Sequence, residues 1–523
     1  MSNQVLRHTR EGIDAEILVL QERIRSLRSS RNALSLVHCL PPEVMVQVFT
    51  WVQILCHEVG PWGDIDPSIL PKWIRVTHVF QHWRNIALSS QALYSTVLSH
   101  NLRYFKGALE LAGSAPLSLI DSVDFQREND AIKWDNKELQ ELVVSILPRV
   151  RSLWLEEPSA KFLHPLLKKS DLNLEQLTVS YWRTLSRSMF PRSLRYLRLH
   201  IYHPKLRFSH WLSGLSNMVE LTLDLDHDSK SAMAIDILSS VLDGMPRLIS
   251  LELGFMLKPT SVQADRAAPI TPKLQNLSLN DDPDHIAEFL PWLSFASRFT
   301  IELKPFTLRV NNGMDWSSFF EQLGQVFRPL SAALRVVEVA WKENWRQRDA
   351  EILFHERAGE SPCLRIFGPV IDKRRFDAWL KAAGALPRGL GHIESLTMDT
   401  PVELAGWRDS PWHGIGTLRQ LTLCNAQISF AYLEYLTALE AEGDRSGESV
   451  SFASLEELSL HGIHYDHDLE TKVQAALVKR MGRGVKLRKL GLYDCNISQD
   501  SVLQLSKVVD LVEHSVKKAA EGI

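Results

Sequence analysis

One short phrase recurs along most of this chain and constrains its fold more than any other feature. The phrase is Leu-x-x-Leu-x-Leu, in which Val, Ile or Met replaces some of the leucines. Weaker copies, at Ile301/Leu303 and Leu364/Phe367, lie in two longer gaps of the series. Clear copies begin at Val150, Leu174, Leu194, Met218, Leu248, Leu274, Leu334, Ile393, Leu418, Leu455 and Leu487. The chain is therefore built largely from repeats.

Each copy predicts a short strand whose leucines point into a shared core while the intervening residues point outward. One copy cannot bury its own leucines, so neighbouring copies have to stack as parallel strands. Helical spacing of apolar residues between the phrases predicts helices over residues 139–147, 235–242 and 498–512. Leu117 and Leu119 predict an opening strand.

The phrase resembles the leucine-rich repeat. Cys495 and Ile497 follow the last copy where that family has Asn or Cys and then Leu, whereas most other copies lack the Asn or Cys. The resemblance implies an α/β fold in which residues 99–523 form an irregular leucine-rich-repeat solenoid. Parallel strands would line its concave face, and helices and loops its convex face.

The residues between the leucines are the candidates for binding a protein substrate on the concave face. The set mixes both charges and contains no arginine cluster of the kind that captures phosphorylated motifs. Its members are Tyr196, Arg198, His200, Glu220, Thr222, Asp224, Asn276, Ser278, Asn280, Gln420, Thr422, Glu457, Ser459, His461, Lys489 and Tyr493.

A different pattern occupies residues 38–98. Pro42 suits the first turn of a helix because its missing N–H is not needed there, and Glu43 suits the positive end of the helix dipole. Apolar residues then recur at three- and four-residue spacing, and residues 60–67 carry turn residues that end the helix. A second helical pattern runs from Trp73 to Ala87. Such a small fragment has little core of its own and would gain from a partner.

The Leu-Pro-Pro start and the later Val79-x-x-x-Trp83 pattern resemble the F-box, which links substrate receptors to cullin-based ubiquitin ligases. The resemblance implies contacts with a Skp-type adaptor and, through the adaptor, with cullin. The loop between the two halves is longer than in most members, as in fungal F-box proteins. The residues that carry over as adaptor contacts are Leu40, Pro41, Pro42, Val44, Val48, Phe49, Val79 and Trp83.

Residues 1–36 precede this module and predict a helix. Its apolar residues at Ile13, Ile17, Leu20, Ile24, Leu27 and Leu34 follow the heptad spacing of a short coiled coil, with Arg31 where another apolar residue would be due. Two interpretations stay open at this point: a homodimer through residues 11–34, or a helix that leans on the following module or is solvated.

Composition narrows the function classes. With 59 basic and 62 acidic residues the formal charge is −3, so a nucleic-acid partner is not expected. The 5 scattered cysteines predict a reducing compartment, cytoplasmic or nuclear, and the charged start and the lack of a long apolar run predict no signal peptide and no membrane span.

Signals for catalysis are weak. His78 and His82 have the spacing of a zinc-binding helix but lack the adjacent Glu of H-E-x-x-H. Neither a Walker-type loop nor a G-x-S-x-G elbow occurs. We expect no enzyme activity, no metal and no cofactor.

An F-box-like start followed by leucine-rich repeats resembles the substrate receptors of SCF-type ubiquitin ligases. The implied function is to hold a protein substrate near the ubiquitin-loaded enzyme, where proximity promotes the reaction. The alternative is a leucine-rich-repeat interaction scaffold that does not act in a ubiquitin ligase.

Overall fold

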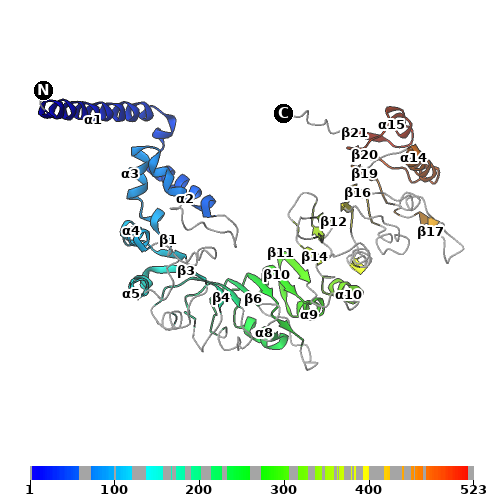
Figure 1. Ribbon diagram of the computed structural model, residues 1–523. Helices are drawn as coiled ribbons and strands as arrows, with labels where there is room; N and C mark the ends of the chain where they lie inside the picture. Colours follow the sequence, from blue (N-terminus) through cyan, green and yellow to red (C-terminus); the bar gives the residue numbers. More distant parts are fainter. Residues whose placement is uncertain are drawn as a thin grey trace. The chain divides into compact units, whose positions relative to one another are not determined.

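Figure 1 shows the computed structural model of the chain. The structure describes residues 3–57, 72–98, 102–120, 137–156, 167, 172–182, 190–201, 212, 214–225, 232–259, 273–305, 316–327, 336–343, 348–357, 362, 364–369, 379, 382–383, 393–399, 417–424, 439–440, 449–450, 452, 454–462 and 467–515. The chain divides into two units, Met1–Tyr202 and His203–Ile523. The expected boundary at residue 98 falls inside the first unit.

The first unit begins with helices, as expected. They are α1 (Asn3–Ala33), the 3-10 helix η1 (Leu36–Cys39), α2 (Pro42–His57), η2 (Lys72–His78), α3 (Gln81–Ser89) and η3 (Gln91–Tyr94). The prediction of one continuous helix from Trp73 to Ala87 is wrong. This segment forms two helices, because η2 ends at His78 and Phe80, in an extended conformation, precedes α3.

The helices α2, η2, α3 and η3 share a small core. Met45, Phe49 and Trp73 are buried in it, and the Trp73 and Tyr94 rings meet edge to face with centroids 5.4 Å apart. The Phe49 and Trp83 ring centroids lie 5.6 Å apart. The buried Gln53 amide donates a hydrogen bond of 3.2 Å to the Leu93 carbonyl and so ties α2 to η3. The second half of the predicted module therefore packs on the first half.

A parallel sheet follows in the first unit. Its strands run in the order β1 (Thr96–Leu98), β2 (Leu117–Ile120), β3 (Val150–Glu156), β4 (Gln176–Trp182) and β5 (Tyr196–Ile201). The helices α4 (Leu102–Ala112) and α5 (Lys137–Ile146) connect the first of them. The predicted opening strand and the helix over residues 139–147 are confirmed. Thr96–Leu98, which the sequence assigned to the helical module, pairs with β2 and starts the sheet.

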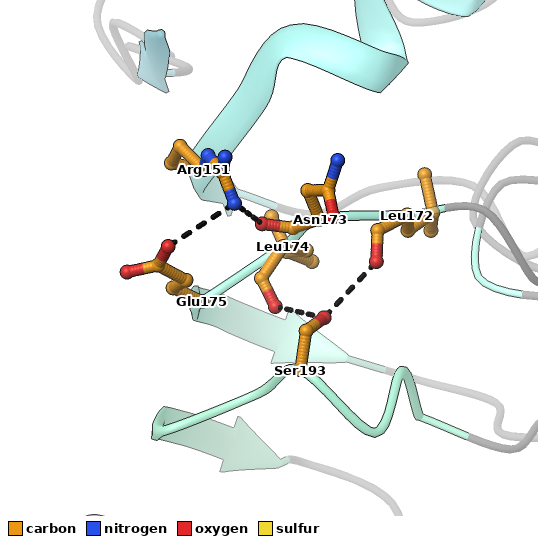
Figure 2. Close-up of polar contacts among 6 residues, drawn as sticks. All are labelled: Arg151, Leu172, Asn173, Leu174, Glu175 and Ser193. Carbon is orange, nitrogen blue, oxygen red and sulfur yellow. Dashed lines mark hydrogen bonds and ion pairs between the residues drawn. The ribbon is translucent and has the colours of Figure 1, made fainter.

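Polar contacts near the starts of β3, β4 and β5 join these neighbouring repeats (Figure 2). The Ser193 hydroxyl donates to the main-chain carbonyls of Leu172 and Leu174, at 3.0 and 2.8 Å. Arg151 forms an ion pair of 3.2 Å with Glu175. Arg151 also donates a hydrogen bond of 3.3 Å to the Asn173 carbonyl, so the side chains of Ser193 and Arg151 both satisfy main-chain carbonyl groups of a neighbouring repeat.

The second unit carries a longer sheet. Its strands lie in the spatial order β6 (Glu220–Leu225), β8 (Ser250–Gly254), β10 (Lys273–Asp281), β11 (Ser294–Pro305), β14 (Leu364–Pro369), β13 (Arg348–His355), β12 (Val336–Glu343), β15 (Ser395–Asp399), β16 (Gln420–Cys424), β19 (Glu457–His461), β20 (Lys489–Tyr493) and β21 (Leu511–Ser515). Short two-residue pairs lie outside it: β7 (Met233–Ala234) with β9 (Leu257–Lys258), and β17 (Leu439–Glu440) with β18 (Ser449–Val450).

The middle of this sheet departs from the expected array. β13 is antiparallel to both its neighbours, β12 and β14, so the prediction of parallel strands throughout is wrong here. The chain turns back twice after β12, which places β14 beside β11 and leaves β12 beside β15. The copy at Val337 is a strand, but it does not stack on the preceding copy. Leu334 itself lies outside the described residues.

Helices cover one face of the strands in the second unit (Figure 1). They are α8 (Ile235–Asp243), α9 (Pro283–Phe289), α10 (Trp316–Phe327), α14 (His467–Gly482) and α15 (Gln499–Leu505). The predicted helix over residues 235–242 is confirmed. The helix predicted over residues 498–512 is too long, because α15 ends at Leu505 and the chain then adds the edge strand β21 on β20.

The same register repeats in both units. Successive leucines pair across the strands, as in Leu177 with Leu197 and Leu421 with Leu458, and all four are buried. Main-chain N–H groups of two consecutive residues, such as Arg419 and Gln420, bond to one carbonyl of the preceding repeat. These stacked strands, with their leucines paired and buried, have the arrangement that the repeated phrase predicts. That all the repeats form one solenoid stays a prediction.

Candidate protein-interaction surfaces

Helix α2 carries two neighbouring apolar stripes. Met45 and Phe49 point into the module core and are each 1% exposed. Val44, Val48 and Trp51 lie on the other stripe and are 39%, 41% and 64% exposed. A surface helix normally has one apolar stripe, which faces the core of its own domain. The open face of α2 is therefore a candidate contact surface for another protein.

The residues predicted to bind an adaptor fall into two groups. Leu40, Pro41, Pro42, Val44, Val48 and Val79 are exposed. Phe49 is buried and Trp83 is half-buried against it, so these two rings contribute to the module core in this structure. Trp51 belongs to the same apolar stripe by its spacing of three from Val48, but it was not among the predicted adaptor contacts.

The Leu-Pro-Pro segment sets the start of α2. The carbonyl of Pro41 accepts hydrogen bonds from the N–H groups of Val44 and Met45, at 3.0 and 3.1 Å, which closes the first turn. Pro42 occupies the first helical position, where the missing N–H has no partner to lose. Leu40 precedes the helix in an extended conformation and is 37% exposed, so it extends the open apolar face at the helix start.

The residues predicted to bind a substrate alternate with buried leucines and lie on the face of the sheet opposite to the leucine core. They form separate groups. One is on β5 in the first unit. In the second unit one group lies on β6 and β10 and another on β16, β19 and β20. From β10 to β16 there are six strand spacings, which at about 4.8 Å each separate the two groups by about 29 Å.

The group at the end of the second unit is the most connected. It comprises Gln420, Glu457, His461, Lys489 and Tyr493 with Glu513 of β21, and we call it the C-terminal patch. The Tyr493 hydroxyl donates a hydrogen bond of 2.6 Å to Glu513, and the His461 ring stacks on the Tyr493 ring at 4.6 Å between centroids.

Gly491 explains how the Tyr493 ring reaches Glu513. A Cβ atom at Gly491 would overlap the Tyr493 ring, so the ring lies back over the glycine along the strand. Glu513 sits directly across from Gly491 in the register of β20 and β21. Tyr493 was among the predicted substrate-binding residues, whereas Gly491 and Glu513 were not. Glu513 was not predicted because the helix expected over residues 498–512 covered the start of its strand, β21, and so hid the pairing with β20.

The hydrogen bonds of the C-terminal patch favour the charged forms of Glu513 and Lys489. Hydrogen bonds from Tyr493 and Lys489 lower the pKa of Glu513, and the hydrogen bond to Glu513 raises the pKa of Lys489. The Lys489 ammonium lies 2.9 Å from the Glu513 carboxylate. Gln420 donates to Glu457 at 3.3 Å on the neighbouring strands. The patch thus offers a flat aromatic surface flanked by charges of both signs, which suits a polar protein segment.

A second polar cluster lies on β11, β14 and β13. Arg365 pairs with the buried Glu351 at 2.9 Å and lies 4.0 Å from Glu302. Lys304 pairs with Glu302 at 3.3 Å, and both Lys304 and Arg365 lie over the Phe367 ring, 5.5 and 5.7 Å from its centroid. The charges are internally matched, so this cluster joins the antiparallel insertion to the repeats. This cluster was not predicted from the sequence, because β13 carries no copy of the repeated phrase.

Asp281 holds the loop after β10. Its buried carboxylate accepts hydrogen bonds from the N–H groups of Leu257 and Asp282, both at 2.8 Å. His285 lies 3.0 Å from the same carboxylate. Burial lowers the pKa of His285, but the hydrogen bond to Asp281 and the nearby carboxylates outweigh it and raise that pKa. These contacts anchor α9 to the preceding repeat.

Cys495 has a comparable position after β20. Its thiol donates to the carbonyl of Leu460 in the preceding repeat at 3.3 Å. This is the position at which the family resemblance implied an Asn or Cys.

Two further features bear on function. Among the described residues, no group of three or more His, Cys, Asp or Glu side chains is arranged to hold a metal ion. Within the same part of the chain no helix is both long and apolar enough to cross a membrane; α1, with 31 residues, is too polar.

Comparisons with known proteins add the following. Neither the protein-family models nor the curated proteins include a match to this chain. A solved structure of a TLR13–ssRNA13 complex is similar over 82% of this chain, with 14% identity and a TM-score of 0.32. This chain spans about half of that one, 54%. An internalin (inlF) from Listeria monocytogenes is similar over 72% of this chain and 83% of its own, with 15% identity and a TM-score of 0.21.

Proposed function

We propose that this chain is the substrate-recognition subunit of an SCF-type ubiquitin ligase. In this proposal the α2–η3 module binds a Skp-type adaptor, which bridges to cullin, and the repeat sheet binds the protein to be modified. The chain itself needs no catalytic residue, because it acts by bringing two proteins together.

The open apolar face of α2 is the observation that carries the proposal. Val44, Val48 and Trp51 follow one helix face next to Leu40 at the helix start. Exposed apolar surface of this extent costs solubility unless a partner covers it, and a helix face with four- and three-residue spacing fits an apolar groove. The Leu-Pro-Pro start and the Val79/Trp83 pattern make a Skp-type adaptor the partner to test first.

The proposal separates the contact residues from the core residues. Leu40, Val44, Val48 and Trp51 would contact the adaptor, whereas Phe49 and Trp83 would support α2 from behind. Substrate would bind on the outward face of the repeat strands, for which the C-terminal patch is the best-defined candidate. Its mixed charges favour an unmodified polar segment over a phosphorylated one.

The test is co-expression of the full chain with a Skp-type adaptor, followed by affinity purification and size-exclusion chromatography. Interface anchors typically cost about 2 kcal/mol or more each on truncation, which is about thirtyfold in affinity. Val48→Asp and the Leu40→Ala/Pro42→Ala double variant should therefore lose the adaptor.

Val144→Asp is a matched control for Val48→Asp. Val144 lies on helix α5, and both side chains are 41% exposed. The control should retain the adaptor as the wild type does. Absence of a complex with well-folded wild-type protein, or equal losses in both Asp variants, would contradict the proposal.

The second candidate is a leucine-rich-repeat interaction scaffold outside any ubiquitin ligase. The C-terminal patch favours a binding role for the sheet whether or not the module binds an adaptor. A chain that binds no adaptor, or binds it without recruiting cullin in a three-component reconstitution, would support this candidate.

A further inference from the structure

Helix α1 exposes a continuous apolar seam. Ile13, Ile17, Leu20, Ile24 and Leu27 follow alternating steps of four and three residues, and each is between 44% and 56% exposed. Ile17 and Ile24 hold one apolar position of the heptad and Leu20 and Leu27 hold the other, which is the repeating seam of a coiled coil. The next core position is held by Arg31, which is also exposed.

Charge is segregated along the same helix. Residues 11–16 carry Glu11, Asp14 and Glu16 and no basic residue. Residues 23–31 carry Arg23, Arg25, Arg28 and Arg31 and no acidic residue. A second copy of the helix running in the opposite direction would set the acidic stretch of each copy against the basic stretch of the other.

We infer that α1 joins two copies of this chain as an antiparallel coiled coil. In the register that aligns the two seams, Ile17 packs against Leu27 of the second copy and Leu20 against Ile24. Asp14 then faces Arg28 of the second copy on both sides of the twofold axis, and Arg31 lies beside Asp14. One like-charge contact remains, between the two copies of Arg23 near the axis.

A parallel pair is less favourable. It would stack Arg31 on Arg31 in the core and set Arg23 against Arg28 of the second copy at both flanking positions. Opposite charges at these flanking positions set the orientation of a coiled coil. The segregated charges therefore select the antiparallel second copy over the parallel one.

The antiparallel arrangement has a consequence for function. From Ile13 to Arg31 the shared rod is about 28 Å long at 1.5 Å per residue. The two chains leave the rod at opposite ends, so each copy keeps its own α2 face open for a partner. The inference does not depend on which protein that partner is.

The first test measures the mass of the full chain by light scattering over a concentration series. The wild type should shift from monomer to dimer as concentration rises, and the shift should weaken with added salt because the flanking charges are exposed. Ile17→Asn/Ile24→Asn should remain monomeric. Leu18→Ala, a change at an exposed apolar residue outside the seam, should dimerise as the wild type does.

Orientation is tested by reversing one charge. Arg28→Asp converts two attractions into two repulsions in the antiparallel dimer, so the dissociation constant should rise about tenfold. In a parallel dimer the same change would pair Asp with Arg23 and strengthen association. Circular dichroism on each variant checks that the substitution leaves the fold intact.

Three results would overturn the inference. A wild type that stays monomeric at all concentrations removes the dimer, and a dimer that survives Ile17→Asn/Ile24→Asn places the contact elsewhere. A dimer strengthened by Arg28→Asp refutes the antiparallel orientation.

Discussion

Substitution of Gly491 by Ala should change stability with opposite signs in two backgrounds. In the wild type the new Cβ atom would overlap the Tyr493 ring, so the ring has to leave its place over the strand. It then loses the 2.6 Å hydrogen bond to Glu513 and the stacking on His461. With the ring removed by Tyr493→Ala, the same Cβ atom meets no ring and only restricts the unfolded chain.

The sign of the stability change depends on whether the lost Tyr493 contacts outweigh the gain from replacing a glycine. A hydrogen bond of this kind contributes about 1 kcal/mol and a ring pair about 0.5–1.5 kcal/mol. Gly→Ala stabilises by about 0.4–1 kcal/mol where the backbone conformation allows it, and the φ of Gly491 is not positive. The net expectation is a loss of about 1 kcal/mol in the wild type, or about 2 °C in Tm for a large domain. In the Tyr493→Ala background we expect a gain in Tm.

The assay is differential scanning calorimetry on the wild type, the two single variants and the double variant. The comparison uses the sign of each Tm shift, so it does not require two-state unfolding of the whole chain. If Gly491→Ala raises Tm in both backgrounds, the Tyr493 ring does not lie over Gly491, and the geometry of the C-terminal patch is refuted.

Two further predictions follow from contacts between repeats. Ser193→Ala and Thr417→Val each remove a hydroxyl that donates a hydrogen bond to a main-chain carbonyl of the preceding repeat. Each substitution should therefore destabilise the protein by about 1 kcal/mol and lower Tm. Ser152→Ala, which removes an exposed hydrogen bond between strands, should leave Tm unchanged. The lowered pKa of Glu513 means that its contribution to stability is present above its unfolded pKa and is lost as pH falls through its folded pKa. The Tm deficit of Tyr493→Phe should therefore shrink as pH falls through the acidic range, and a deficit that does not vary with pH would contradict this.

The repeat strands could be predicted because the phrase encodes both burial and register. Leu421, Leu458 and Leu490 are buried and pair in sequence across β16, β19 and β20. Alternation of apolar and polar residues along a strand shows which face of the sheet each side chain occupies. The same alternation occurs in parallel and antiparallel strands, so it does not show the direction of a strand. The antiparallel strand β13 therefore could not be distinguished from a loop or a parallel strand by its local pattern. The bonds that fix it, such as Arg365 to Glu351, join residues whose pairing depends on the fold already formed.

The candidate adaptor site shows the same limit on a helix. Val44, Met45, Val48 and Phe49 are all apolar, so periodicity alone allows either stripe of α2 to face the core. The choice is made by partners distant in sequence: Trp83 packs on Phe49, and Leu93 accepts a hydrogen bond from Gln53 on the same side. Once these contacts bury Met45 and Phe49, the other stripe is left open. The apolar residues of α2 that are not needed for the core therefore require a different explanation, and a protein partner on that face provides one.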